Sequence, residues 1–132
     1  MMRFADTSYF LALLVPNDEY HAAALELAAD WRGQLVTTDF ILLEVANHLS
    51  PRTSRGVFGK FRDLISAEPR MTLVAASREW VDRGAALYES RGDKDWSLTD
   101  CISFVVMERE RISEALTADH HFEQAGFTAL LK

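Results

Sequence analysis

The stretch Met2-Arg3-Phe4-Ala5-Asp6-Thr7-Ser8, followed by the apolar run from Tyr9 to Val15, decides the fold of this chain. Its first four residues read as a short strand, and Thr7 or Ser8 can then cap a helix that runs through Leu14. The apolar run is far shorter than the roughly 20 residues that span a bilayer. We therefore expect a core helix, no membrane partner and a cytoplasmic location.

The rest of the chain alternates short apolar strands with amphipathic helices. Asp18 can cap a second helix, and later helices are expected at about 39–49, 54–67, 77–89 and 99–110. The expected strands are 35–37, 71–74, 115–117 and 127–130. This alternation is typical of a parallel sheet covered by helices on both faces. The sequence therefore predicts an α/β fold, in which ligands bind beyond the carboxyl ends of the strands.

Composition indicates one globular domain over residues 1–132. Hydrophobic residues make up 48% of the chain and charged residues 26%, and no repeat or low-complexity linker divides it. A single cysteine, Cys101, excludes an internal disulfide and a multi-cysteine metal cluster. It lies in an apolar run, which favours a buried and inert thiol.

Charge is distributed unevenly along the chain. The formal net charge is −6, yet residues 45–62 contain no acid and carry four basic residues, Arg52, Arg55, Lys60 and Arg62. These four side chains have two interpretations. They can be an ordinary solvated helix and loop, or they can contact the phosphates of a nucleic acid.

Four acids interrupt or end apolar segments. Asp6 and Asp119 each follow an expected strand directly, Asp100 opens an expected helix, and Glu44 lies inside the apolar stretch 40–46. Helix capping is an alternative interpretation for the three aspartates, and Asp100 fits a capping box with Ser97. Glu44 has no such explanation, because a carboxylate on an apolar helix face must be desolvated or face a cleft. Asn47 and His48 share its helix face and favour a cleft.

Convergence of these four acids would require a counter-charge. At about 5 Å and an effective dielectric of about 20, each pair of like charges costs roughly 3 kcal/mol. Protonation or a bound cation must relieve this repulsion. Ligands that are all oxygen atoms favour Mg²⁺ or Mn²⁺ over zinc.

The order and spacing of these residues resemble the PIN-domain ribonucleases. The resemblance rests on Asp6-Thr7-Ser8 after a strand, Glu44 in a mid-chain helix, Trp96-Ser97-Leu98-Thr99-Asp100, and Leu116-Thr117-x-Asp119-x-x-Phe122. With the closing Gly126-Phe127, the chain is most similar to the toxin component of VapBC-type toxin–antitoxin modules. The resemblance covers essentially the whole chain. It implies a three-layer α/β/α sandwich with a central parallel sheet in the order 3-2-1-4-5.

The resemblance also implies an activity and its residues. By position, Asp6, Glu44, Asp100 and Asp119 match a catalytic quartet that binds Mg²⁺ or Mn²⁺, and Thr7 and Ser8 match hydroxyl positions that orient the first aspartate or a metal-bound water. The implied reaction is metal-dependent hydrolysis of RNA, which leaves 5′-phosphate and 3′-hydroxyl ends. The implied partners are a cognate antitoxin that inserts into the acidic cleft and a second copy of the chain in a homodimer. The role of Asp95 is left open.

Three other interpretations of the sequence compete with this one. His120 and His121 could act as an acid–base pair of the ribonuclease A kind, although paired histidines after a strand are usually partly exposed turn residues. A non-catalytic nucleic-acid or protein-binding module could use the same fold. A phosphoaspartate enzyme or receiver domain is disfavoured, because Ser8 stands where such proteins place a second acid.

Overall fold

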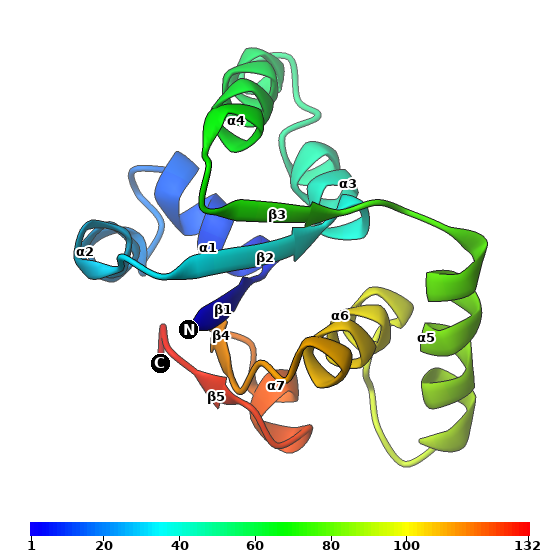
Figure 1. The fold of residues 1–132 in the computed structure, drawn as a ribbon. Coiled ribbons are helices and arrows are strands. Elements are labelled where there is room, and N and C mark those ends of the chain that lie inside the picture. Colours follow the sequence, from blue (N-terminus) through cyan, green and yellow to red (C-terminus); the bar gives the residue numbers. More distant parts are fainter.

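The structure is a computed structural model that describes residues 1–132. Its centre is a five-stranded sheet in the order β3-β2-β1-β4-β5. The strands are β1 (Met2–Ala5), β2 (Gln34–Thr38), β3 (Met71–Val74), β4 (Glu114–Leu116) and β5 (Thr128–Ala129). All neighbouring strands pair in parallel (Figure 1). The predicted α/β class and strand order are therefore confirmed.

Seven helices cover the sheet in two layers. One layer contains α1 (Thr7–Leu14), α2 (His21–Asp30), α3 (Asp39–His48) and α4 (Arg55–Ala67). The other contains α5 (Arg78–Ser90), α6 (Leu98–Glu110) and α7 (His120–Gln124). Helices pack against one another within each layer, as α1 does with α3 and α5 does with α6 (Figure 1). This is the expected α/β/α sandwich, and none of its helices is long and apolar enough to cross a membrane.

The core lies on both sides of the central strands. Phe4 of β1 is fully buried and lies near Phe122, whose ring meets Phe104 of α6 edge to face at 4.9 Å. Cys101 of α6 is a buried free thiol, as predicted. Helix α6 thus has more buried side chains than any other helix of the molecule.

Several local predictions were wrong. Asp18 does not cap α2, because its carboxylate accepts the Tyr20 N–H at 2.8 Å and closes a turn before the helix begins at His21. Helix α7 was not predicted at all, since five residues are too few to show a helical periodicity. Strand β4 begins and ends one residue earlier than expected, and β5 has only two residues.

The strand order sets the place of the functional site. β1 is paired with β2 on one side and with β4 on the other. The chain runs from β1 through β2 to β3 at one edge and then returns to β4 on the opposite side of β1, so the strand order reverses between β1 and β4. Ala5 and Leu116 are paired residues at the ends of β1 and β4, and the Asp6 N–H donates to the Leu116 carbonyl at 3.1 Å. The residues that follow these two strands therefore emerge side by side at the carboxyl edge, where open α/β sheets bind ligands.

Candidate active site

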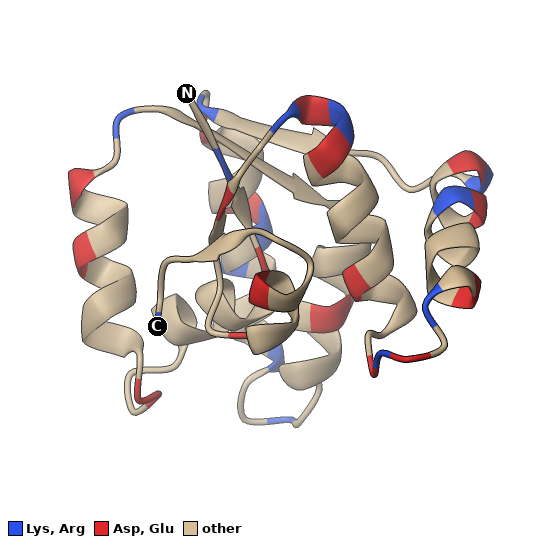
Figure 2. Cartoon of the chain, turned by 90° about the horizontal axis from the view of Figure 1, so that it is seen from below, with Lys and Arg blue, Asp and Glu red and all other residues tan.

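A cavity of about 350 Å³ at this edge is lined by all four acids. Asp6 follows β1, Glu44 comes from α3, Asp100 from the first turn of α6, and Asp119 from the residue before α7. In Figure 2, acidic segments of separate elements gather toward the middle of the molecule. The other lining residues include no lysine or arginine and are Thr7, Ser8, Leu11, His48, Asp95, Ser97 and His121.

Asp6 is the most buried of the four acids, at 5% exposure. Thr117 Oγ1 donates to its Oδ2 at 2.7 Å, and Ser8 Oγ donates to the same oxygen at 3.4 Å. Burial raises the pKa of Asp6 to about 7. The hydrogen bond from Thr117 lowers this pKa, whereas the negative charges of Asp100 and Glu44 raise it. Asp6 is therefore a carboxyl group that needs a nearby cation to stay ionised at neutral pH.

The two hydroxyl residues that follow Asp6 have different partners. Thr7 is buried, and its hydroxyl donates to the Glu44 carboxylate rather than to Asp6. Ser8 contacts Asp6 and also accepts the Ala118 N–H at 3.1 Å. One hydroxyl thus joins α1 to α3, and the other joins α1 to the end of β4.

Asp100 and Asp119 lie in the cavity and also cap helices. Asp100 Oδ2 accepts the Ser97 N–H at 3.2 Å while Ser97 Oγ accepts the Asp100 N–H at 3.0 Å, which completes the predicted capping box. Asp119 Oδ1 accepts the His121 N–H at 2.9 Å at the start of α7. Asp6 occupies the corresponding position before α1 but makes no capping bond through its side chain. Burial raises the pKa of Asp100 above its ordinary value, and the charge of Asp119 adds to this effect.

His121 lies in the site, although the sequence offered it only as half of an alternative acid–base pair with His120. Its Nδ1 lies 3.3 Å from Asp100 Oδ2 and 3.3 Å from Asp119 Oδ1, and its side chain is only 20% exposed. The buried Nδ1 makes no hydrogen bond. His120 is different, because its side chain is 61% exposed and its Nδ1 is 3.7 Å from Asp119. The interpretation as a partly exposed turn residue fits His120, whereas the first turn of α7 directs His121 into the cavity.

Two further residues acquire a place in the site. Thr117 is fully buried between Asp6 and the Asp119 N–H, which donates to its Oγ1 at 3.0 Å. The sequence signal for Thr117 was its place at the end of an expected strand, two residues before Asp119. Asp95 lines the cavity from the segment between α5 and α6.

The basic stretch lies elsewhere. Arg55 donates to the Ser50 carbonyl at 2.9 Å and lines a separate hollow between α3 and α4. Arg52, Lys60 and Arg62 are exposed on α4 or on the turn before it. None of these four side chains lines the acidic cavity.

Comparison with known proteins agrees with this geometry. The family model for the PIN domain matches residues 3–128. The 23S rRNA-specific endonuclease VapC20 of Mycobacterium tuberculosis is 29% identical over 132 residues, covering 96% of this chain and 95% of that protein.

Solved structures show the same fold. The crystal structure of Mycobacterium tuberculosis VapC20, a Sarcin-Ricin loop cleaving toxin, has a TM-score of 0.87 at 23% identity and covers 97% of both chains. VapBC2 from Rickettsia felis, bound to a DNA fragment from its promoter, has a TM-score of 0.69 at 13% identity, covering 98% of this chain and 97% of that chain. Because the family model spans nearly the whole chain and the acids meet where its fold places a ligand, this chain belongs to the PIN-domain family.

Proposed function

We propose that this chain is a metal-dependent endoribonuclease, the toxin of a toxin–antitoxin pair, built as a single PIN-like domain over residues 1–132. The observation that carries the proposal is the shared cavity. Four of its five carboxyl groups come from residues 6, 44, 100 and 119, so the fold brings together acids from both ends of the chain. Carboxylates that converge in one cavity, with Asp6 among them buried, repel one another and destabilise the fold unless a cation neutralises them. The relative VapC20, whose name describes an RNA endonuclease, supports RNA as the substrate.

The donor set fits a divalent ion. Asp6, Glu44, Asp100 and Asp119 offer carboxylate oxygens, the ligands that Mg²⁺ and Mn²⁺ prefer. The unpartnered Nδ1 of His121 lies 3.3 Å from an oxygen of Asp100 and from one of Asp119. A divalent ion bound in this cavity would have these carboxylates as its candidate ligands, with His121 beside Asp100 and Asp119 as a further candidate.

The chain's own residues prepare the cavity for hydrolysis. Thr117 and Ser8 both donate to one oxygen of Asp6, and Thr7 fixes Glu44. The caps fix Asp100 and Asp119 in the same way. When bound, Mg²⁺ or Mn²⁺ supplies the Lewis acid that activates water and offsets charge on the phosphate. Hydrolysis of this kind leaves 5′-phosphate and 3′-hydroxyl ends.

A cleavage assay tests the proposal. Ribosomal RNA is incubated with the wild-type chain in Mg²⁺, in Mn²⁺ or in EDTA, alongside Asp6→Asn, and the product ends are identified by ligation. We expect cleavage with either ion, 3′-hydroxyl ends, no cleavage in EDTA, and at most a few per cent of activity in Asp6→Asn. Cleavage in EDTA with cyclic phosphate ends would instead assign the reaction to the histidines. RNA binding without cleavage would instead support a non-catalytic module that binds nucleic acid.

A cognate antitoxin and a second copy of the chain complete the proposed assembly. An apolar groove of about 340 Å³ between α1, α2 and α4 suits a helix of the antitoxin. Leu25 and Leu64 at this groove are 48% and 68% exposed, which is unusual for large apolar side chains without a partner. An arginine of the antitoxin would neutralise the acidic cavity, because a guanidinium binds carboxylates in two parallel hydrogen bonds. The homodimer remains a prediction from family resemblance.

A further inference from the structure

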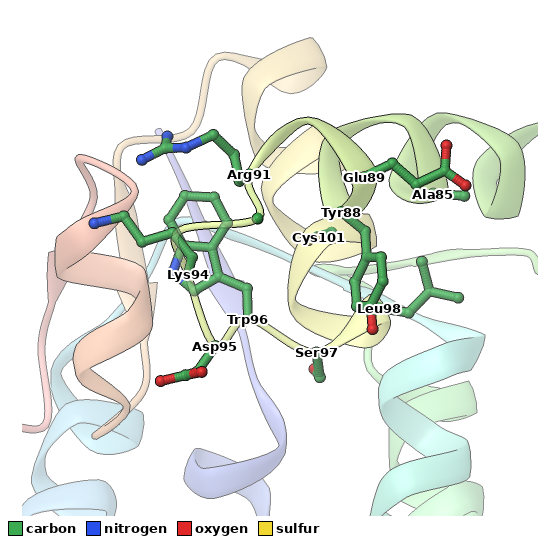
Figure 3. A pocket seen from close by; sticks show the side chains of 11 residues that line it. Ala85, Tyr88, Glu89, Arg91, Lys94, Asp95, Trp96, Ser97, Leu98 and Cys101 are labelled. Carbon is green, nitrogen blue, oxygen red and sulfur yellow. The ribbon is translucent and has the colours of Figure 1, made fainter.

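A second and larger cavity, which we call the flanking cavity, adjoins the acidic cavity. It measures about 940 Å³ and lies between the end of α5 and the start of α6. Asp95 and Ser97 line both cavities, so the two share a wall. Figure 3 shows the segment between the helices crossing this cavity, with Arg91 and Lys94 extending to one side of it and Tyr88 lying on the other.

The flanking cavity carries the cations that the acidic cavity lacks. Five carboxyl groups line the acidic cavity, with no lysine or arginine, so an RNA strand gains no attraction there from basic side chains. Lys94 lines the flanking cavity together with Arg91, Glu89 and Asp95, and its Nζ forms only a long ion pair, 3.9 Å, with the exposed Asp93. Its ammonium group is therefore available to a phosphate.

Arg91 is fixed more firmly than Lys94. Its guanidinium lies over the Trp96 ring at 4.9 Å and donates to the Asp93 carboxylate at 3.0 and 3.2 Å. The Trp96 indole N–H in turn donates to Gln124 of α7 at 3.0 Å. These contacts tie the segment to the layer that carries Asp100 and Asp119, so the flanking cavity keeps a fixed position relative to the acids.

An aromatic side chain is also available. Tyr88 of α5 is 52% exposed, and its ring contacts no other aromatic ring. A cation on one side of a cavity and an exposed aromatic ring on the other can hold a nucleotide of single-stranded nucleic acid, because the base stacks on the ring and the charge follows the backbone. A volume of this size is sufficient for a nucleotide.

We propose that the flanking cavity binds a nucleotide of single-stranded RNA next to the bond that is cut, with its base on Tyr88 and its phosphate at Lys94. This inference rests on the proposed function, and it assigns the RNA path to the segment between α5 and α6 rather than to the basic stretch on α4. An acidic peptide could use the same cation. RNA is favoured because the cavity continues into the acidic cavity, where the scissile phosphate must lie.

Fluorescence anisotropy with a labelled single-stranded RNA tests the proposal. Binding is measured with Ca²⁺ in place of Mg²⁺ across a salt series, after a gel has shown the RNA to be intact. Lys94→Gln is compared with Lys60→Gln, which removes the same charge from exposed α4. We expect Lys94→Gln to reduce the slope of log affinity against log salt by about 0.7, the value for one phosphate contact on a single strand, and Lys60→Gln to leave the slope unchanged.

The aromatic contact is tested in the same assay. Tyr88→Leu should weaken binding about ten-fold, because stacking of one base on an aromatic ring is lost, whereas Tyr88→Phe should bind as the wild type does. Thermal unfolding checks that each variant is folded. Equal effects of Lys94→Gln and Lys60→Gln, or wild-type binding by Tyr88→Leu, would overturn the proposal while leaving metal-dependent cleavage intact. Loss of binding to the antitoxin without loss of binding to RNA would show a protein-docking surface instead.

Discussion

Asp100 Oδ2 and Asp119 Oδ1 each accept a capping N–H, and the same two oxygens lie nearest to His121 Nδ1. A carboxylate oxygen has more than one lone pair, so an oxygen that caps a helix can still bind a cation. The capping and metal-binding interpretations of these residues are therefore compatible. A cap fixes the side chain at the start of its helix, and the positive end of the helix dipole stabilises its negative charge. The same sequence pattern, an acid at a helix start, thus serves local stability and leaves the carboxylate oriented toward the cavity.

His121 and His120 provide a matched pair of substitutions at this scale. If His121 is a ligand, Mn²⁺ bound to the wild-type protein will show nitrogen coupling in pulsed EPR spectra. We expect His121→Ala to abolish this coupling and to weaken Mn²⁺ binding by at least about ten-fold, the lower range for loss of a residue that supports a metal. His120→Ala should retain both, because its side chain is 61% exposed and lies farther from the acids. An unchanged spectrum in His121→Ala would exclude the histidine from the metal site.

At the scale of elements, α5 and α6 form the closest helix pair in the molecule, and this pair positions the flanking cavity. Gly84 of α5 is buried, and a Cβ at this position would lie 2.3 Å from Ile102 Cγ1 and 3.2 Å from the Ile102 backbone. The glycine therefore sets how near the two helices approach. A side chain at this position would force Ile102 or the backbone of the two helices to move.

Gly84→Ala tests this close contact. We expect the free energy of unfolding to fall by about 1–3 kcal/mol, the usual cost of overpacking, as measured by urea denaturation. Gly59→Ala on α4 is the control, because nothing lies within 4 Å of a Cβ there. This control should stabilise the protein by about 0.5–1 kcal/mol through helix propensity. Equal stability of the two variants would contradict the proposed packing role of Gly84.

The elements also show how far the sequence predicts this protein. Helices α3 to α6 and the strands β1 to β3 follow periodic patterns, and the sequence predicted them to within a few residues. Helix α7 is too short to show such a pattern, and therefore the inward direction of His121 was not predictable. The four acids stood out because each ends or interrupts an apolar segment. Thr117 did not, because its role depends on the pairing of β1 with β4, which brings residues 5 and 116 together.

At the scale of the whole molecule, the acidic cavity costs stability in the metal-free protein. The pKa of Asp6 is raised from 3.8 to about 7, so the folded state binds a proton more tightly than the unfolded chain does. The contribution of protonated Asp6 to the free energy of unfolding is fully present below about pH 4 and is lost as the pH rises through about 7. The shift of about three pKa units corresponds to roughly 4 kcal/mol, which is a large part of the stability of a domain of this size.

Asp6→Asn should therefore stabilise the whole fold in EDTA at pH 8, because it replaces a buried charge by a neutral group that can still accept the Thr117 hydroxyl. We expect a gain on the order of 2–4 kcal/mol over the wild type at pH 8, shrinking toward zero at pH 4, in urea denaturation series across this range. Saturating Mn²⁺ should reverse the order at pH 8, because an ion that binds only the folded wild type at about 1,000 times its dissociation constant adds about 4.1 kcal/mol. A stability difference that stays constant from pH 4 to pH 8 would mean that the Asp6 carboxyl group is not the buried acid that opposes folding.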